Sequence, residues 1–214
     1  MRALIVAGAP GREVSETVSR IAAAHDYVIA ADAGAAACLA AHVKPDMVVG
    51  DLDSLDERLR TFLESHQVPM RVVSAEKDET DLDLAVQAAR EAGASTTTFT
   101  GVIGGRLDHT LAAIGSLARA SDLMPELMEG GLVGWLLAED GRRLLEIEKH
   151  VGATVSLLAL VDSIVSCVGF RYPLDRARLS LLSSRGVSNV CTKLASVVEV
   201  HSGTLLVLLL PEHD

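Results

Sequence analysis

The first half of the chain alternates between short apolar runs and longer stretches in which apolar residues recur at helical spacing. The short runs predict five strands. Ala3–Ala7, Tyr27–Ala31, Met47–Gly50 and Met70–Ser74 are mainly apolar, and Thr96–Thr100 is rich in β-branched residues. The intervening stretches predict helices, around Val14–Ala22, from Gly34 to about Ala41, and over Asp56–Ser65, Asp81–Ala92 and Leu107–Ala120. Thr80 is a suitable N-cap for the fourth helix. This alternation predicts a parallel sheet with helices on its faces.

The pattern changes near Asp122–Pro125. From Gly131 onward, short apolar runs are separated by polar turns, and no long helical period appears. These runs predict strands at Leu132–Ala138, Leu144–Glu148, Thr154–Leu160, Ser163–Val168, Ser196–His201 and Thr204–Leu210. Glu139–Gly141 and Ser202–Gly203 have the composition of hairpin turns. We therefore predict an α/β fold, with an N-terminal Rossmann-like, parallel-sheet domain over residues 1–122 and a C-terminal antiparallel β-sandwich domain over residues 130–214.

The composition argues against several classes of protein. The formal net charge of −10 argues against the basic face that broad nucleic-acid binding requires. The three cysteines are too few and too scattered for a disulfide framework or a CxxC metal site. The N-terminus begins directly as a strand without a secretion-signal pattern, and the apolar run at Leu205–Leu210 is too short to cross a bilayer. We therefore expect a cytoplasmic protein that binds neither nucleic acid nor membranes.

Polar residues gather in four loops that follow predicted strands of the first domain. The loops are Asp32–Gly34, Gly50–Ser54, Lys77–Asp81 and Gly101–His109. Because parallel strands point the same way, the loops at their carboxyl ends share one edge of the sheet. We therefore expect these four loops to form one site.

Asp51 and Asp53 are the most distinctive pair in these loops. If the loop stays extended, both carboxylates project on the same side of the backbone. Paired carboxylates suit a hard cation such as Mg²⁺, although a solvated turn has the same composition. In the next loop, Asp78 or Asp81 could complete the metal site and Lys77 could neutralise phosphate; the alternative is that its carboxylates only cap the following helix.

The glycine-rich loop Gly101–His109 opens the last predicted helix. Its glycines allow a ligand to approach the backbone, and free N–H groups at a helix start favour anions. Arg106 offers a planar fork for phosphate oxygens. Asp108 could meet a metal or orient Arg106. His109 could act on a proton, but a structural hydrogen bond is the commoner role for a single histidine in a helix.

In order, these motifs resemble those of the thiamine pyrophosphokinase family, whose pattern runs ADGGA, KPD, GDxDS, KDxTD and GGRxDH. The corresponding segments are Ala31–Ala35, Lys44–Asp46, Gly50–Ser54, Lys77–Asp81 and Gly104–His109. In the second domain, Gly169–Leu174 and Ser188–Asn189 match more loosely. Two positions depart from the pattern. Ala33 replaces a glycine, which matters if the backbone there needs angles that only glycine tolerates, and Tyr172 stands where many relatives have tryptophan.

The resemblance implies an enzyme, ATP:thiamine diphosphotransferase, that moves a pyrophosphoryl group from ATP to thiamine and yields thiamine diphosphate and AMP. It implies Mg²⁺ held by Asp51, Asp53, Asp81 and Asp108. It implies catalytic roles for Asp78, Asp81, Arg106 and Asp108, with Asp78 orienting the attacking hydroxyl or supporting the metal ligands. Nucleotide contacts would come from Asp32, Gly34, Lys77, Thr80, Gly104, Gly105, Arg106 and His109.

For the second substrate, the resemblance implies thiamine contacts from Tyr172, Ser188 and Asn189, which otherwise read as turn residues of a sandwich. It also implies a homodimer, with thiamine bound between the α/β domain of one subunit and the β domain of the other.

Three other hypotheses remain open from the residues alone. The first domain would serve equally well in a pyrophosphokinase for another hydroxymethyl heterocycle, such as a pterin. Asp51–Asp53 also has a superficial likeness to the nucleophile loop of haloacid dehalogenase-like phosphatases, but it follows the third predicted strand and not the first. A non-catalytic thiamine- or nucleotide-binding module is the third, although a sensor need not retain every acidic residue.

Overall fold

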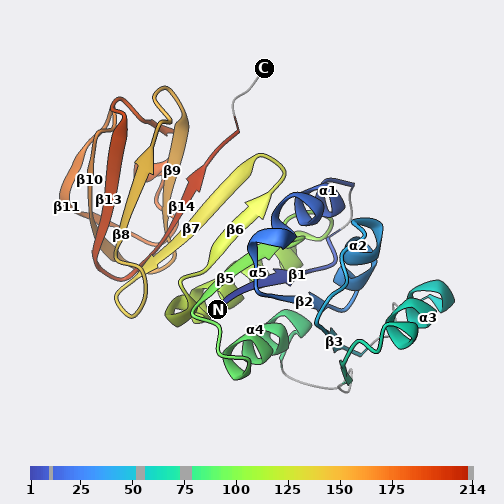
Figure 1. Ribbon diagram of the computed structural model, residues 1–214. Coiled ribbons are helices and arrows are strands. Elements are labelled where there is room, and N and C mark those ends of the chain that lie inside the picture. The colour runs from blue at the N-terminus through green and yellow to red at the C-terminus, as the bar shows by residue number, and fades with distance from the viewer. Residues whose placement is uncertain (10–11, 52–55, 73–78, 212–214) are drawn as a thin grey trace. The chain divides into compact units, whose positions relative to one another are not determined.

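The computed structural model describes residues 1–9, 12–51, 56–72 and 79–211 (Figure 1). The chain divides into two compact units. The first contains Met1–Ser116 and Met128–Gly130, and the second contains Leu117–Leu127 and the chain from Gly131 onward. The residues of strand β6 (Glu126–Glu129) are divided between the two units.

The first unit is built on five parallel strands in the order β5-β1-β2-β3-β4. The strands are β1 (Arg2–Val6), β2 (Tyr27–Ala31), β3 (Met47–Gly50), β4 (Met70–Val72) and β5 (Thr96–Thr100). The helices are α1 (Arg12–Ile21), α2 (Gly34–Ala40), α3 (Glu57–Ser65), α4 (Asp81–Glu91) and α5 (Leu107–Arg119). This arrangement confirms the predicted parallel-sheet domain, because each predicted strand and helix of the first half is present.

Strands β1, β2, β3 and β5 are buried on both faces of the sheet, whereas the edge strand β4 is largely exposed. Alternate residues of a strand point to opposite faces, so Leu4 and Val6 lie on one side of β1 and Ala3 and Ile5 on the other, and all four are fully buried. Leu4 and Val6 belong to one core cluster with apolar residues of α1, α2 and α3. Helix α4 lies on the opposite side of the strands from α1 and α2 (Figure 1). Burial on both faces explains why these strands read as continuous apolar runs.

The strand order reverses at β1, because β2 lies on one side of it and β5 on the other. Such a switch point is where open α/β sheets bind ligands. Two glycines bring the chain close to this end of β1. A Cβ at Gly34 would overlap the carbonyl oxygen of Val6, and a Cβ at Gly101 would overlap that of Ala7. Gly34 therefore has a packing role, which lets the first turn of α2 approach β1.

The second unit is an antiparallel β-sandwich, as predicted. One sheet contains β12-β9-β14-β7, and the other contains β11-β10-β13-β8. The strands are β7 (Leu132–Ala138), β8 (Leu144–Glu148), β9 (Thr154–Ala159), β10 (Ser163–Val168), β11 (Leu174–Leu179), β12 (Asn189–Val190), β13 (Ala195–Ser202) and β14 (Thr204–Leu209). Their inward-facing side chains form one apolar cluster that draws on strands of both sheets.

Both predicted hairpins are wrong. The turn at Glu139–Gly141 joins β7 to β8, and the turn at Ser202–Gly203 joins β13 to β14, but in each case the two strands belong to different sheets. Turn-forming residues indicate that the chain reverses its direction. They do not indicate whether the next strand pairs with the preceding one or joins the other sheet of the sandwich. Strands β6, β11 and β12 were not predicted. In β11 the burial does not alternate, and Arg176 has a positive φ of 42°.

Cys38, Cys167 and Cys191 are free and buried, which confirms that they form no disulfide framework. Burial raises the pKa of the Cys38 thiol to about 12, so this side chain behaves as an apolar residue. Over the ranges that the structure describes, none of the helices combines the length and the apolar character that a membrane span requires.

Candidate active site

A cavity of about 650 Å³ lies in the first unit, where its strands end. Its walls come from the loops that follow β1, β2, β3 and β5, together with the N-terminal ends of α4 and α5. The predicted site loops therefore share one edge of the sheet, as the parallel order requires. The volume falls in the range of roughly 300–1,000 Å³ that is typical of small-ligand sites.

Two aspartates line the cavity from neighbouring strands, Asp32 after β2 and Asp51 after β3. The Asp32 backbone has a φ of 44° and donates its N–H to the Val49 carbonyl at 2.8 Å, which fixes it against β3. Aspartate is one of the few side chains that tolerate this left-handed conformation, and such strain often marks functional sites. Asp53, the second member of the predicted pair, lies outside the described residues.

Ala33 causes no backbone strain, although the family pattern has glycine there. Its φ of −57° and ψ of −13° are helical, and the positive φ falls on Asp32 instead. The added methyl group faces Gly8, where a Cβ would lie only 2.5 Å from that of Ala33. The chain thus accommodates alanine at position 33 because position 8 has no side chain.

The N-terminus of α4 is held by a capping box. Thr80 Oγ1 accepts the Asp83 N–H at 3.2 Å, and Asp83 Oδ2 accepts the Thr80 N–H at 3.3 Å, which confirms Thr80 as the N-cap. Asp83 Oδ1 also accepts the hydroxyl of buried Ser116 on α5 at 2.7 Å. This network fixes α4 relative to α5 and places Thr80 and Asp81 in the cavity wall. Lys77 and Asp78 lie outside the described residues.

The glycine-rich loop supplies the cationic part of the cavity. Gly104, Gly105, Arg106 and His109 all line it. Asp108 is not among the lining residues and forms a two-point ion pair with Arg106, with Nη2–Oδ2 at 2.6 Å and Nε–Oδ1 at 3.2 Å. The Arg106 guanidinium lowers the pKa of Asp108 to about 2, and the carboxylate raises the pKa of Arg106. A carboxylate with so low a pKa is a poor proton acceptor at neutral pH, so Asp108 is suited to orienting Arg106.

The cavity's carboxylates fit magnesium by their chemistry. Asp32, Asp51 and Asp81 all line the cavity, and oxygen is the ligand atom that Mg²⁺ prefers. Within the part of the chain that the structure describes, no three acidic, histidine or cysteine side chains converge on a single metal position. Magnesium normally keeps several positions for water and phosphate oxygens, so one or two carboxylates are enough to hold it.

The predicted thiamine residues lie together in the second unit. The Tyr172 side chain is 60% exposed, whereas Asn189 is only 4% exposed. Asn189 accepts the Tyr172 N–H at 3.0 Å and donates to the Tyr172 carbonyl at 2.8 Å, so its amide holds the backbone that carries the tyrosine ring. Ser188 has a φ of 58° and donates its N–H to Ser156 at 3.1 Å.

Sequence reasoning missed part of the cavity wall. Ala7–Ala9, after β1, line the cavity beside Asp32, and Ala112 and Ala113 contribute from α5. The first of these could have been found with the rule used for the other loops, because a glycine follows the first predicted strand. The two helical alanines carry no chemical signal, since they only leave room.

Comparison with known proteins supports the resemblance drawn from the motifs. Residues 18–128 match the family described as thiamin pyrophosphokinase, catalytic domain, and residues 144–207 match the thiamin pyrophosphokinase vitamin B1 binding domain. The curated thiamine pyrophosphokinase of Bacillus subtilis is 29% identical over 194 residues, which span 86% of this chain and 87% of that protein.

Solved structures share the fold. A crystal structure of thiamine pyrophosphokinase from Bacillus subtilis has a TM-score of 0.83 at 23% identity, with both chains fully covered. Thiamin pyrophosphokinase from Candida albicans has a TM-score of 0.79 at 16% identity, over 99% of this chain and 90% of that one. The catalytic-domain match covers just over half of the 214 residues, and the chain therefore belongs to the thiamin pyrophosphokinase family.

Proposed function

We propose that this protein transfers a pyrophosphoryl group from ATP to thiamine, giving thiamine diphosphate and AMP. The first unit would correspond to the ATP-binding catalytic domain, although the range predicted for that domain, residues 1–122, extends into the second unit. The second unit would correspond to the thiamine-binding domain, predicted over residues 130–214, of which Gly130 belongs to the first unit. The proposal is supported by the two family matches and by the chemistry of the cavity in the first unit.

The observation that carries the proposal is the mixture of charges in that cavity. Asp32, Asp51, Glu79 and Asp81 line it together with Arg106 and the N-terminal ends of two helices. Helix N-termini and arginine favour phosphate, whereas the carboxylates repel it. A triphosphate that arrives with magnesium would satisfy both groups, because the carboxylates would hold the cation and the cation would offset the charge of the phosphates.

In this proposal the protein works mainly by alignment and charge neutralisation. The hydroxyethyl oxygen of thiamine attacks the β-phosphorus, the bond from that phosphorus to the α-phosphate bridging oxygen breaks, and AMP leaves. Bound magnesium would draw negative charge from the phosphate oxygens. Asp51, Asp53 and Asp81 are the proposed ligands. Asp108, which the family resemblance adds to this set, pairs through both oxygens with Arg106 in the structure.

The remaining side chains of the first domain have positioning roles in the proposal. Arg106, oriented by Asp108, would neutralise charge on the transferred group, and Lys77 would do the same from its own loop. Asp78 would orient the attacking hydroxyl. Nucleotide contacts would come from Asp32, Thr80, Gly104, Gly105 and His109.

Thiamine binding is proposed for the exposed ring of Tyr172, with Ser188 and Asn189 beside it. The side-chain amide of Asn189 forms hydrogen bonds with the Tyr172 N–H and carbonyl, which would fix the backbone that carries the ring. A pterin substrate is disfavoured because the second domain matches a vitamin B1 binding family. A non-catalytic module is disfavoured because the acidic, basic and glycine motifs of the catalytic family are all present.

We also propose a cytoplasmic homodimer, on the family resemblance. Light scattering after size-exclusion chromatography should give twice the mass of one chain. A mass of one chain at micromolar concentration would contradict the dimer.

The reaction itself is tested by its products. With ATP, Mg²⁺ and thiamine, we expect AMP and thiamine diphosphate in equal amounts, separated by ion-exchange chromatography. Chelation of the metal should abolish both products, because the cavity carboxylates would then repel the triphosphate. Formation of ADP without AMP would exclude pyrophosphoryl transfer, and AMP formed only with a pterin alcohol would change the substrate.

Asp51→Asn should lower kcat/KM on the order of 100-fold, about 3 kcal/mol of transition-state stabilisation, because it removes a charged metal ligand and preserves shape. The matched control is Asp26→Asn, near the opposite end of β2, where the carboxylate accepts the Arg2 N–H at 2.7 Å. The control should stay within about twofold of wild type. Near-normal turnover in Asp51→Asn would remove this residue from the metal site.

Tyr172→Ala should raise the KM for thiamine about three- to tenfold and leave the KM for ATP unchanged, because it removes a stacking surface. Tyr172→Phe keeps the ring and should behave like wild type. Leu194→Ala is the control, since it removes another exposed apolar side chain of the same unit. An unchanged thiamine KM in Tyr172→Ala would exclude the ring from the site.

A further inference from the structure

The glycine-rich loop begins with backbone amides that converge on a carboxylate outside the family motifs, that of Glu129. The Val102 N–H donates to Glu129 Oε1 at 2.6 Å, and the Ile103 N–H donates to the same oxygen at 3.2 Å. A backbone hydrogen bond from Gly101 also lowers the pKa of this carboxylate. Successive N–H groups that point to one place form the kind of nest that binds anions in proteins. Here the chain fills the nest with its own side chain.

Partial burial of the Glu129 carboxylate is compensated by hydrogen bonds from the loop. Glu129 is only partly exposed, and burial raises its pKa, against the opposing effect of the Val102, Ile103 and Gly101 amides. The nearby Glu13 carboxylate raises the pKa further. A partly buried carboxylate is unfavourable unless hydrogen bonds compensate it, so the loop and Glu129 stabilise each other.

The segment that carries Glu129 is itself fixed to α1. The Gly130 N–H donates to the hydroxyl of Thr17 at 3.2 Å, and Thr17 is 2% exposed. Arg20 Nη2 donates to the Gly130 carbonyl at 2.7 Å, and Met128 packs against the apolar cluster that contains α1. Glu129 therefore projects from a backbone that is held on both sides.

The loop continues directly from these amides into the cavity wall. Gly101 is fixed against β1, because its carbonyl accepts the Ala9 N–H at 2.8 Å and a Cβ there would overlap the Ala7 carbonyl oxygen. After the two amides bound by Glu129, the chain reaches Gly104–Arg106, which line the cavity. The direction in which the loop leaves β5 is thus set by β1 on one side and by Glu129 on the other.

We propose that Glu129 is a positioning residue for nucleotide binding, whose carboxylate oxygen holds the first amides of the loop so that Gly104–Arg106 face the triphosphate. This inference rests on the proposed function of the cavity. It assigns the role to the reach of one acceptor oxygen, because Oε1 accepts both the Val102 and the Ile103 N–H.

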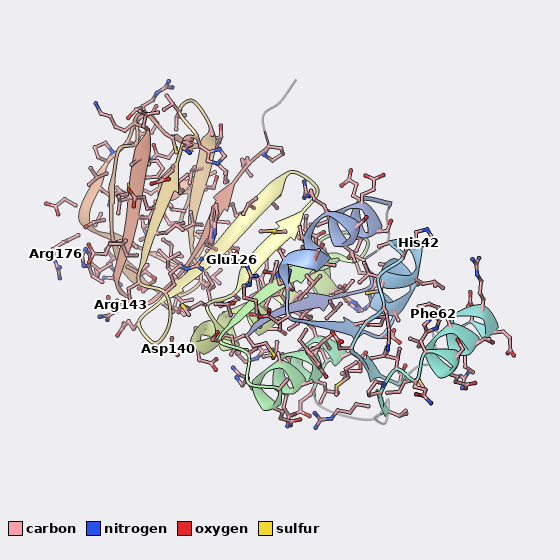
Figure 2. All side chains as sticks on the ribbon, in the orientation of Figure 1. His42, Phe62, Glu126, Asp140, Arg143 and Arg176 are labelled. Atoms are coloured by element: carbon pink, nitrogen blue, oxygen red, sulfur yellow. The ribbon has the colours of Figure 1, made fainter. Side chains whose placement is uncertain are left out.

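Three substitutions separate reach from charge. Glu129→Gln keeps an acceptor oxygen at the same distance and loses the charge, Glu129→Asp keeps the charge and withdraws the oxygen by one methylene, and Glu129→Ala removes both. The matched control is Glu126→Ala on the same strand (Figure 2), where the carboxylate pairs with Arg142 at 2.7 Å in the second unit. Binding of magnesium α,β-methylene-ATP, which the reaction cannot cleave, is measured by calorimetry with the full chain.

Glu129→Ala and Glu129→Asp should weaken nucleotide binding about tenfold, because the loop loses its anchor. Glu129→Gln should stay within about threefold of wild type and Glu126→Ala within about twofold. In steady-state assays the KM for ATP should rise in parallel, with the KM for thiamine unchanged. Wild-type affinity in Glu129→Asp, or failure of Glu129→Gln to restore binding, overturns the proposal; Glu129→Asp decides the matter if Glu129→Ala does not fold.

Hydrogen exchange of the free protein tests the anchor without any substrate. The Val102 and Ile103 amides should be protected in wild type and Glu129→Gln and should exchange about tenfold faster in Glu129→Asp. Unprotected amides in wild type overturn the proposal. Wild-type protein that binds the nucleotide but forms no thiamine diphosphate would refute the proposed function. The calorimetry and the hydrogen exchange of the Glu129 variants would still decide whether Glu129 positions the loop.

Discussion

The cavity depends on how closely backbone segments approach the carboxyl end of β1. Gly34 and Gly101 lie where a Cβ would overlap the carbonyl oxygens of Val6 and Ala7. Without side chains at these two points, α2 and the loop after β5 can begin directly beside β1, where the strand order reverses. Asp32 and Arg106, which lie close to these glycines in the sequence, line the cavity beside β1. A sterically enforced contact between backbone segments therefore underlies a site whose chemistry is electrostatic.

The site combines negatively charged carboxylates with a positively charged arginine, and separate loops and helices hold these groups in place. Asp32, Asp51 and Asp81 come from three different loops, and Arg106 is turned by its ion pair with Asp108. Carboxylates that line one cavity repel each other and repel phosphate, and a cation bound among them would reduce both repulsions. The capping box at Thr80 and the contact of Asp83 with Ser116 hold the helices in place against this repulsion.

Much of the fold and of the site could be predicted because the signals are local. Strand and helix periods identified each element of the first half, and the parallel order placed Asp32, Asp51, Asp81 and Arg106 at one edge. The hairpins at Glu139–Gly141 and Ser202–Gly203 failed because a turn's composition does not say which sheet the next strand joins. The ligand contacts of Gly34, Thr80 and Asn189 stay predictions. The structure adds contacts within the protein for each of them, with β1, Asp83 and Tyr172 respectively.

The sequence by itself determined the family, the order of the elements in the first half of the chain and the chemical types that the site contains, because motif spacing and hydrophobic period are properties of neighbouring residues. Only the tertiary structure decided which backbone groups those residues hold. Ala33 is tolerated because Gly8, 25 positions earlier, lies against it. Glu129 meets the amides of Val102 and Ile103 because β6 returns to the first unit. Contacts between residues far apart in the sequence produce no periodic pattern along the chain, so they are seen only in the folded structure.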